Sequence, residues 1–157
     1  MFADVEILKE SHMSCRIEQY PTKLFLKNIE FNKNTCWIDI GKYFPKKSFV
    51  SNGSQGKVTV DYIDYNFFEN EREINVSVYF VNHQIEKATI MIPAINNDYD
   101  HTDEMDFYQK RDQREKKYQK WLDQVLIKTN LEPDHSRIMV GSDKSENTLI
   151  AISLILS

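Results

Sequence analysis

The chain has 157 residues, 41% of them hydrophobic and 12% aromatic, which is enough to bury one core without disulfides or a metal ion. Its formal net charge is −4, whereas nucleic-acid-binding proteins usually carry a strong basic excess. No apolar run is long enough to span a bilayer, and the N-terminus lacks the basic and apolar regions of a secretory signal. We therefore expect one cytoplasmic domain covering residues 1–157.

The first predicted element is a β-hairpin. The apolar pattern of Lys23 to Phe31 predicts one strand, and Thr35 to Ile40 predicts its partner across the turn-forming Asn-Lys-Asn of residues 32–34. Residues 41–56 end in a cluster of Ser, Asn, Gly and Gln, which is typical of a loop. Residues 2–20 give no clear pattern. The first third of the chain is therefore expected to hold one hairpin and one long loop.

Three further segments alternate apolar and polar residues with the period of a β-strand. They span residues 57–65, 74–81 and 85–92. In the first, Val58, Val60 and Tyr62 share the face that we expect to be buried. The acidic residues 66–73 and the pair Asn82-His83 are predicted turns, and Pro93 should end the third strand because proline cannot donate to a ladder. Short connections of this kind predict an antiparallel meander.

One long helix is predicted over about residues 103–127, because Tyr118, Trp121, Leu122 and Val125 recur at helical spacing. Asp100 or Thr102 is expected to cap it. Residues 137–140 and 148–156 predict a last hairpin across residues 141–147. Its second strand is nearly apolar, so we expect it to be covered on both faces, central, and under the helix. The predicted fold class is α+β, with a mainly antiparallel sheet and the helix packed on it.

No pattern in the sequence predicts a catalytic residue, a metal site or a cofactor site, so we do not expect an enzyme. The four histidines, His12, His83, His101 and His135, have no His or Cys partner at metal-ligand spacing. Residues 53–57 are too short for a phosphate-binding loop, and a strand follows them instead of a helix. Cys15 and Cys36 are isolated and are expected to be reduced thiols.

Charge segregation is the feature of this sequence that bears on function. Two segments, at 61–73 and 98–106, are acidic, and aromatic residues are interleaved in the first. The helix carries six basic residues between positions 110 and 120. Aromatic side chains supply buried contact area at interfaces and charges supply steering, so the acidic segments predict a surface for a basic partner protein. The predicted partner-binding residues are Asp61, Asp64, Tyr65, Phe67, Phe68, Glu69, Glu71, Glu73, Asp98, Asp100, Asp103 and Glu104.

The helix segment YQKWLDQVL (118–126), followed by a terminal hairpin around GSDKSEN (141–147), resembles the immunity proteins of bacterial polymorphic toxin systems, including those of contact-dependent growth inhibition. The order of meander, helix and terminal hairpin is similar to some members. This resemblance implies a one-to-one complex with a cognate toxin domain, often a nuclease, that is blocked by covering its active site or an essential surface. A nuclease cleft attracts phosphate and would attract carboxylates likewise.

Three alternatives stay open. A phage-encoded inhibitor of host defence would have the same sequence features as an immunity protein. A small ligand-binding or enzymatic domain would have a concave pocket with convergent polar groups between helix and sheet. An RNA-binding module would use the Lys/Arg face of the helix, and its affinity would fall steeply with salt.

Overall fold

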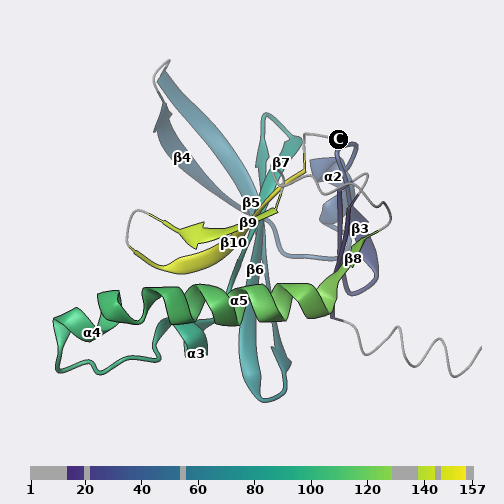
Figure 1. Cartoon of the computed structure of the whole chain (residues 1–157). Helices are drawn as coiled ribbons and strands as arrows, with labels where there is room; N and C mark the ends of the chain where they lie inside the picture. Colours follow the sequence, from purple (N-terminus) through teal and green to yellow (C-terminus); the bar gives the residue numbers. More distant parts are fainter. Residues whose placement is uncertain (1–13, 20–21, 54–55, 129–137, 144–145, 155–157) are drawn as a thin grey trace, which may run out of the picture.

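The computed structural model describes residues 14–19, 22–53, 56–128, 138–143 and 146–154, which form two β-sheets and one long helix (Figure 1). The strands are antiparallel except for one parallel pair, so the predicted α+β class is confirmed. The described residues contain no helix that is both long and apolar enough to cross a membrane.

The larger sheet has six strands in the order β4-β5-β6-β7-β10-β9. The strands are β4 (Lys47–Gly53), β5 (Gly56–Glu69), β6 (Arg72–Val81), β7 (Gln84–Met91), β9 (Ile138–Ser142) and β10 (Thr148–Ser153). The meander β5-β6-β7 and the terminal hairpin β9-β10 were both predicted and are confirmed. Asn82 and His83 form the predicted turn, and both adopt positive φ, as a two-residue hairpin turn requires.

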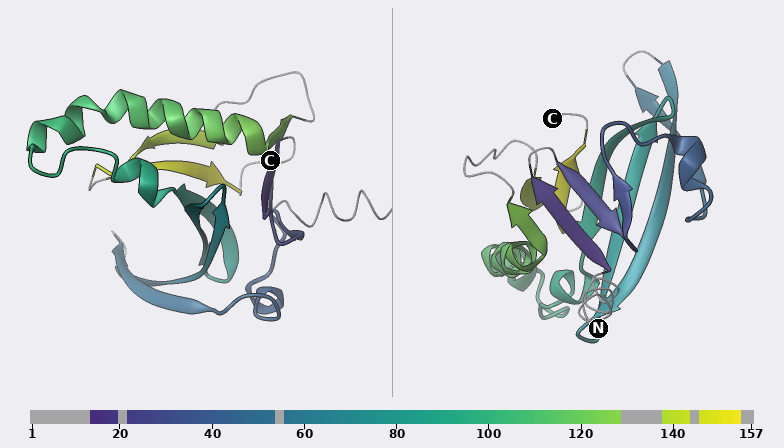
Figure 2. Two further views of the ribbon diagram at one scale, coloured as in Figure 1. Left: turned by 90° about the horizontal axis from the view of Figure 1, so that it is seen from below. Right: turned by 90° about the vertical axis from the view of Figure 1, so that its right-hand side faces the viewer.

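One face of this sheet forms the core. Ile74, Val76, Val78 and Phe80 of β6 are all buried, as the alternation predicts. Helix α5 (Arg111–Val125) lies across the same face, and Tyr118, Trp121, Leu122 and Val125 are its buried apolar residues (Figure 2). The Tyr118 hydroxyl accepts a hydrogen bond from the Ile92 amide at 2.8 Å and bonds Asn96 Oδ1 at 2.9 Å. These bonds fix the helix to the end of β7.

The smaller sheet has the order β3-β2-β1-β8. Its strands are β1 (Cys15–Gln19), β2 (Lys23–Leu26), β3 (Ile29–Phe31) and β8 (Leu126–Lys128). The predicted strand at 23–31 is therefore a hairpin in itself, because Lys27 and Asn28 take positive φ and turn the chain. The predicted partner strand at 35–40 is wrong: Trp37–Ile40 form the short helix α2, in which Trp37 and Ile40 both reach the core.

Three other expectations for residues 41–73 are wrong. Residues 47–53 form strand β4 instead of a loop, because they pair in unbroken register with β5. Strand β5 continues to Glu69, so the turn is shortened to Asn70 and Glu71. Val58, Val60 and Tyr62 are not in the core, because the alternate residues of β5, such as Ile63, face it. Period two identifies the two faces of a strand, but it does not say which face is covered.

The predicted long helix is interrupted at Lys110, where α4 (Glu104–Gln109) ends and α5 begins. Its N-cap is Asp103, which accepts from the Met105 amide at 3.0 Å, and not Asp100 or Thr102. Pro93 ends β7 as predicted and begins the unpredicted short helix α3 (Pro93–Asn96).

The terminal hairpin is confirmed with one correction. Strand β10 is interior to the sheet and lies under α5. Its residues alternate between buried and half-buried, so it is covered fully on one face only. Strand β9 extends through Ser142, into the predicted turn.

Candidate partner-binding surface

The end of the β5–β6 hairpin presents an exposed aromatic ring beside carboxylates. Phe68 is 74% exposed, and its direct cross-strand neighbour is Glu73. The adjoining turn contributes the exposed Glu71. Among the described residues, no partner forms a hydrogen bond or an ion pair with the side chain of either glutamate. Of the predicted partner-binding residues in the first acidic segment, Phe68, Glu71 and Glu73 remain free to contact another molecule.

Glu69 differs from its neighbours because it points toward the helix. Its carboxylate accepts a hydrogen bond from the indole Nε1 of Trp121 at 3.1 Å. A small pocket of about 110 Å³ opens here, lined by Glu69, by the polar residues Ser14 and Gln124, and by the apolar residues Cys15, Phe67, Phe68 and Val125. A pocket of this composition suits a long side chain with an apolar stem and a positive end.

The remaining acidic residues of β5 are held within the sheet. Asp61 is buried and accepts from the Ser48 hydroxyl at 2.6 Å. Asp64 accepts from Ser77 at 2.6 Å and forms an ion pair with Lys47 at 3.1 Å. Their carboxylates already have partners inside the protein.

The two aromatic residues predicted between these acids are also largely enclosed. Phe67 is buried, and Tyr65 packs between Phe67 and Phe44. Four predicted partner-binding residues lie in this part of β5: Asp61, Asp64, Tyr65 and Phe67. None of them is as exposed as Phe68.

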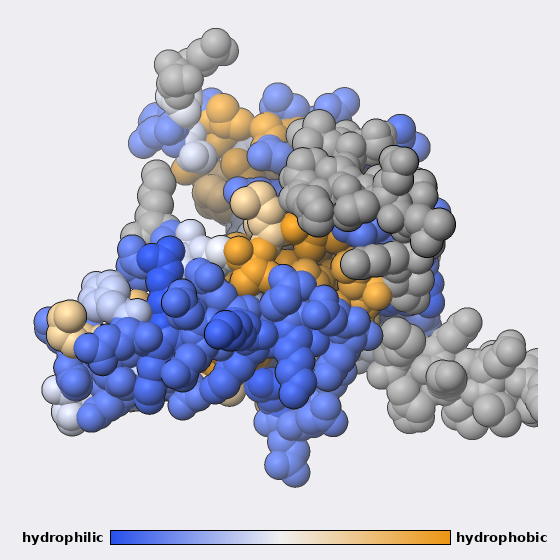
Figure 3. All heavy atoms as spheres, viewed as in Figure 1, coloured by the Kyte–Doolittle hydropathy of each residue, from blue (hydrophilic) through white to orange (hydrophobic). Residues whose placement is uncertain are grey.

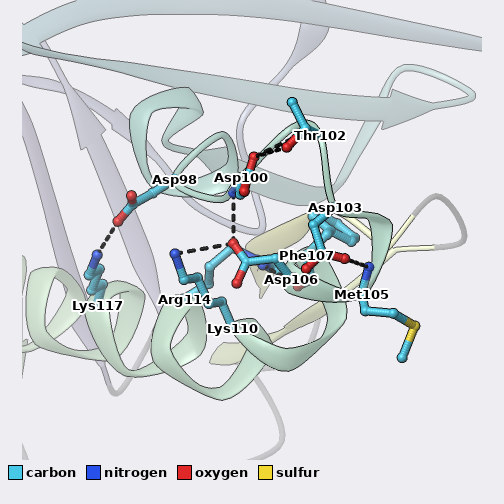
Figure 4. A network of polar contacts seen from close by, with 10 residues as sticks. All are labelled: Asp98, Asp100, Thr102, Asp103, Met105, Asp106, Phe107, Lys110, Arg114 and Lys117. Carbon is cyan, nitrogen blue, oxygen red and sulfur yellow. Dashed lines mark hydrogen bonds and ion pairs between the residues drawn. The ribbon is translucent and has the colours of Figure 1, made fainter.

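The second acidic segment organises the loop between α3 and α4 (Figure 4). Asp98 pairs with Lys117 at 2.6 Å, and Asp100 accepts from both the amide and the hydroxyl of Thr102. Asp106 accepts from the Asp100 amide at 2.7 Å. These bonds stabilise the ionised carboxylates and lower the pKa of Asp98, Asp100 and Asp106. The exposed Glu104 lies on the first turn of α4.

The structure nevertheless brings the two acidic segments to the same side of α5. Lys117, which pairs with Asp98, and Trp121, which donates to Glu69, are one helical turn apart. Helix α3 and the end of the β5–β6 hairpin both lie along this side of α5 (Figure 1). The sequence separates Glu69 from Asp98 by almost thirty positions, so only the packing of both segments on α5 brings them to contacts one helical turn apart.

The basic face of the helix is less continuous than the sequence implies. Arg114 is buried, with its Nη1 donating to the Phe107 carbonyl at 2.6 Å and its guanidinium carbon 4.0 Å from the Phe107 ring centre. Lys110 pairs with Asp106, and Arg111 with Glu115 and Glu146. Lys116 and Lys120 stay exposed. Several basic side chains of the helix are therefore already paired within the protein. The helix does not present the extended positive face that an RNA-binding surface would need.

Sequence reasoning missed the open face of the six-stranded sheet. A groove of about 420 Å³ lies there, on the side opposite to α5, lined largely by apolar side chains such as Val60, Tyr79, Met91 and Leu149. The face also carries a row of aromatic rings: Phe49 meets Tyr62 edge-on at 5.6 Å, and Tyr62 stacks on Tyr79 at 5.9 Å. The alternation of β5 contains the signal, but it does not tell whether the face with Val58, Val60 and Tyr62 is covered or open.

The distribution of hydropathy differs between the helix and the sheet. Hydrophilic residues cover α4 and α5 on the face seen in Figure 3, whereas hydrophobic residues gather above the helix and toward the β4–β5 hairpin. The described residues hold no group of three or more His, Cys, Asp or Glu that could bind a metal ion. Cys15 is buried and Cys36 is exposed, and both are free thiols.

No family model, curated protein or solved structure shows a significant match to the chain.

Proposed function

We propose that this protein is a cytoplasmic inhibitor that binds a basic partner protein one-to-one through the end of the β5–β6 hairpin. The observation that carries the proposal is the exposed ring of Phe68 beside Glu71 and Glu73. Binding energy at interfaces concentrates in a few aromatic anchors, and surrounding charges steer association. Phe68 would be the anchor, and the glutamates would guide the approach.

The pocket beside Phe68 supports a basic partner in particular. Its apolar walls include Phe67 and Val125, and Glu69 contributes its carboxylate. A lysine or arginine of the partner would lay its stem on the apolar walls and bring its charge toward Glu69. Glu69 already accepts from Trp121, so the carboxylate is held in place before the partner arrives.

The resemblance to immunity proteins suggests which basic partner this is. A nuclease domain has a cleft that attracts phosphate, and the same positive potential attracts carboxylates. We propose a cognate nuclease-type toxin as the partner, inhibited because the hairpin end covers its active site or an essential surface.

The test is capture of the partner by the tagged protein from cells of the source organism, followed by an activity assay of the captured protein. We expect one protein retained in stoichiometric amount at moderate salt, with nuclease activity that returns when the complex is dissociated. Phe68→Ala should weaken binding about tenfold or more. Glu71→Lys with Glu73→Lys should slow association, and the effect should shrink as salt rises.

Matched control variants test whether binding depends on the hairpin end in particular, or on any loss of negative charge or of an exposed aromatic ring. Asp39→Lys with Asp112→Lys makes the same charge change at exposed helical positions, and Tyr43→Ala removes another exposed aromatic ring. Both controls should bind as the wild type does. Equal loss in the controls, or undiminished binding by the Phe68 and glutamate variants, would remove the hairpin end as the binding surface.

A further inference from the structure

Strand β4 is an edge strand of the sheet that the described residues form, and its one charged residue, Lys47, lies at its first position. It is the first strand of the six-stranded sheet, and its seven residues are all exposed. Phe49 is 44% exposed and Val50 is 62% exposed. Its register with β5 runs from Lys47 to Gly53 without a bulge, and the strand contains no proline. Edges of this kind are templates for an added strand.

The geometry of the β5–β6 hairpin determines which residues of β4 direct their backbone groups outward. Asn70 and Glu71 both take positive φ, as in a two-residue turn whose flanking residues, Glu69 and Arg72, exchange both backbone hydrogen bonds. Hydrogen-bonded pairs then alternate along β5, so its odd-numbered residues bond β6 and its even-numbered residues bond β4.

The even residues of β5 are paired with Lys47, Phe49 and Ser51. The backbone N–H and C=O groups of the alternate residues Ser48, Val50 and Asn52 therefore point away from the sheet.

We infer that β4 pairs antiparallel with β4 of a second copy of this chain, with the two Val50 residues facing each other across a two-fold axis. Val50 would then oppose Val50, and Ser48 would oppose Asn52. This register uses every outward backbone group of the three residues, which gives about six hydrogen bonds. The contact is isologous and closes as a dimer, so it leaves no free edge at β4.

The side chains are compatible with this register. Lys47 is the single charged residue of β4 and would lie opposite Gly53, so the two lysines stand at opposite ends of the interface. Like charges are therefore not brought together. On the open face, Phe49 would lie opposite Ser51, which leaves room for its ring. The aromatic row Phe49-Tyr62-Tyr79 would continue into the partner copy.

This inference does not depend on the proposed function. Strand β4 pairs with residues 56–62 of β5, whereas Phe68 and Glu69 lie at the other end of that strand. The separation between Val60 and Phe68 is about 25 Å at the rise of an extended strand. Each copy in the dimer therefore keeps its hairpin end accessible.

The first test is the mass of the full chain in solution by sedimentation equilibrium over a wide concentration range. We expect the mass to rise from 18.6 kDa to twice that value. Val50→Pro removes an outward N–H while leaving the bonds to β5 intact, so it should stay monomeric with an unchanged circular dichroism spectrum. Val50→Ala keeps the N–H and should still dimerise. A wild type that remains monomeric throughout, or a dimeric Val50→Pro variant, overturns the inference.

A cross-linking test does not depend on how well the proline variant folds. Facing residues in a hydrogen-bonded pair have Cα atoms about 5.5 Å apart, within the range of a disulfide. In a Cys36→Ser background, Val50→Cys should form a disulfide-linked dimer on mild oxidation. Lys47→Cys lies far from its counterpart in the proposed register and should not. Equal cross-linking of the two variants overturns the pairing.

Discussion

The indole of Trp121 donates a hydrogen bond to the Glu69 carboxylate at 3.1 Å, and this bond joins α5 to the end of β5. Trp121 is buried, while Glu69 is half-buried beside the pocket next to Phe68. The helix that completes the core therefore also positions a carboxylate of the proposed binding surface.

Trp121→Ala should lower the free energy of unfolding by about 3–5 kcal/mol, because a large buried side chain is removed. Trp121→Phe keeps most of the apolar contact but loses the donor to Glu69, so its loss should be smaller. Urea denaturation measures both. Equal stability of Trp121→Ala and the wild type would show that the indole is not part of the core.

Glu69→Gln separates the structural role of this residue from its charge. The amide oxygen can still accept from Trp121, so we expect stability close to that of the wild type. Partner association should nevertheless slow, because the negative charge is gone. A large drop in the urea midpoint would show that the carboxylate charge itself is needed for folding.

Arg114 is 2% exposed and fixes α4 against α5 through Phe107. Its Nε also lies 3.4 Å from the hydroxyl of Thr148. Arg114→Ala should destabilise the protein by about 2–4 kcal/mol, because the Phe107 carbonyl loses its donor and a cavity forms. Arg111→Ala, at an exposed position on the same helix, is the control and should change stability by less than about 1 kcal/mol. Thermal unfolding of the two variants distinguishes these outcomes.

Stability should fall at alkaline pH. Burial raises the pKa of the Cys15 thiol from 9.0 to about 12 and that of the Tyr118 hydroxyl from 10.0 to about 12. The folded state therefore keeps both protons over a range in which the unfolded state releases them. Their contribution is fully present below pH 9 and is lost as pH rises from 9 to 12.

Cys15→Ala should reduce the decline in the free energy of unfolding between pH 9 and 10. The decline that is due to Tyr118 should remain. The measurement is urea denaturation at successive pH values. An unchanged pH dependence in Cys15→Ala would contradict the assignment of that part to the thiol.

Asp106 should contribute to stability at the acidic end. The Asp100 amide, which donates to its carboxylate, lowers its pKa, and Lys110 acts in the same direction. A depressed pKa contributes stability above the ordinary value of 3.8, and this contribution is lost as pH falls below it. Asp106→Asn should therefore show a weaker acid dependence than the wild type, and faster hydrogen exchange at the Asp100 amide. Glu104→Gln, which changes an exposed acid two residues earlier, should show neither effect.

The sequence was most informative where one face of an element is fully buried. The meander, the terminal hairpin and the apolar face of α5 follow from periodicity, because Ile74 to Phe80 and Tyr118 to Val125 repeat with the spacing of a strand and of a helix. It was least informative where an element is short, where a strand is exposed on both faces, or where both faces of a strand carry apolar residues. Strand β4 and helix α2 were missed for this reason, and Val58 to Tyr62 were assigned to the wrong face.

For the candidate site, composition identified the acidic segments but not the state of each acid. Asp61, Asp64 and Asp98 look equivalent to Glu71 and Glu73 in the sequence. Their partners, Ser48, Lys47 and Lys117, are supplied by other elements, so packing decides which carboxylates stay free. Phe67 and Phe68 are adjacent in the chain, but the alternation of β5 buries one and exposes the other.

The sequence by itself determined the fold class, the main strands and helix, and the segregation of charge, because these depend on local periodicity and composition. The tertiary structure alone decided which face of the large sheet α5 covers, which acids remain unpaired, and that Glu69 and Asp98 contact α5 one helical turn apart. The physical reason is that burial and pairing are properties of surfaces brought together from distant parts of the chain, and local patterns do not specify which surfaces meet.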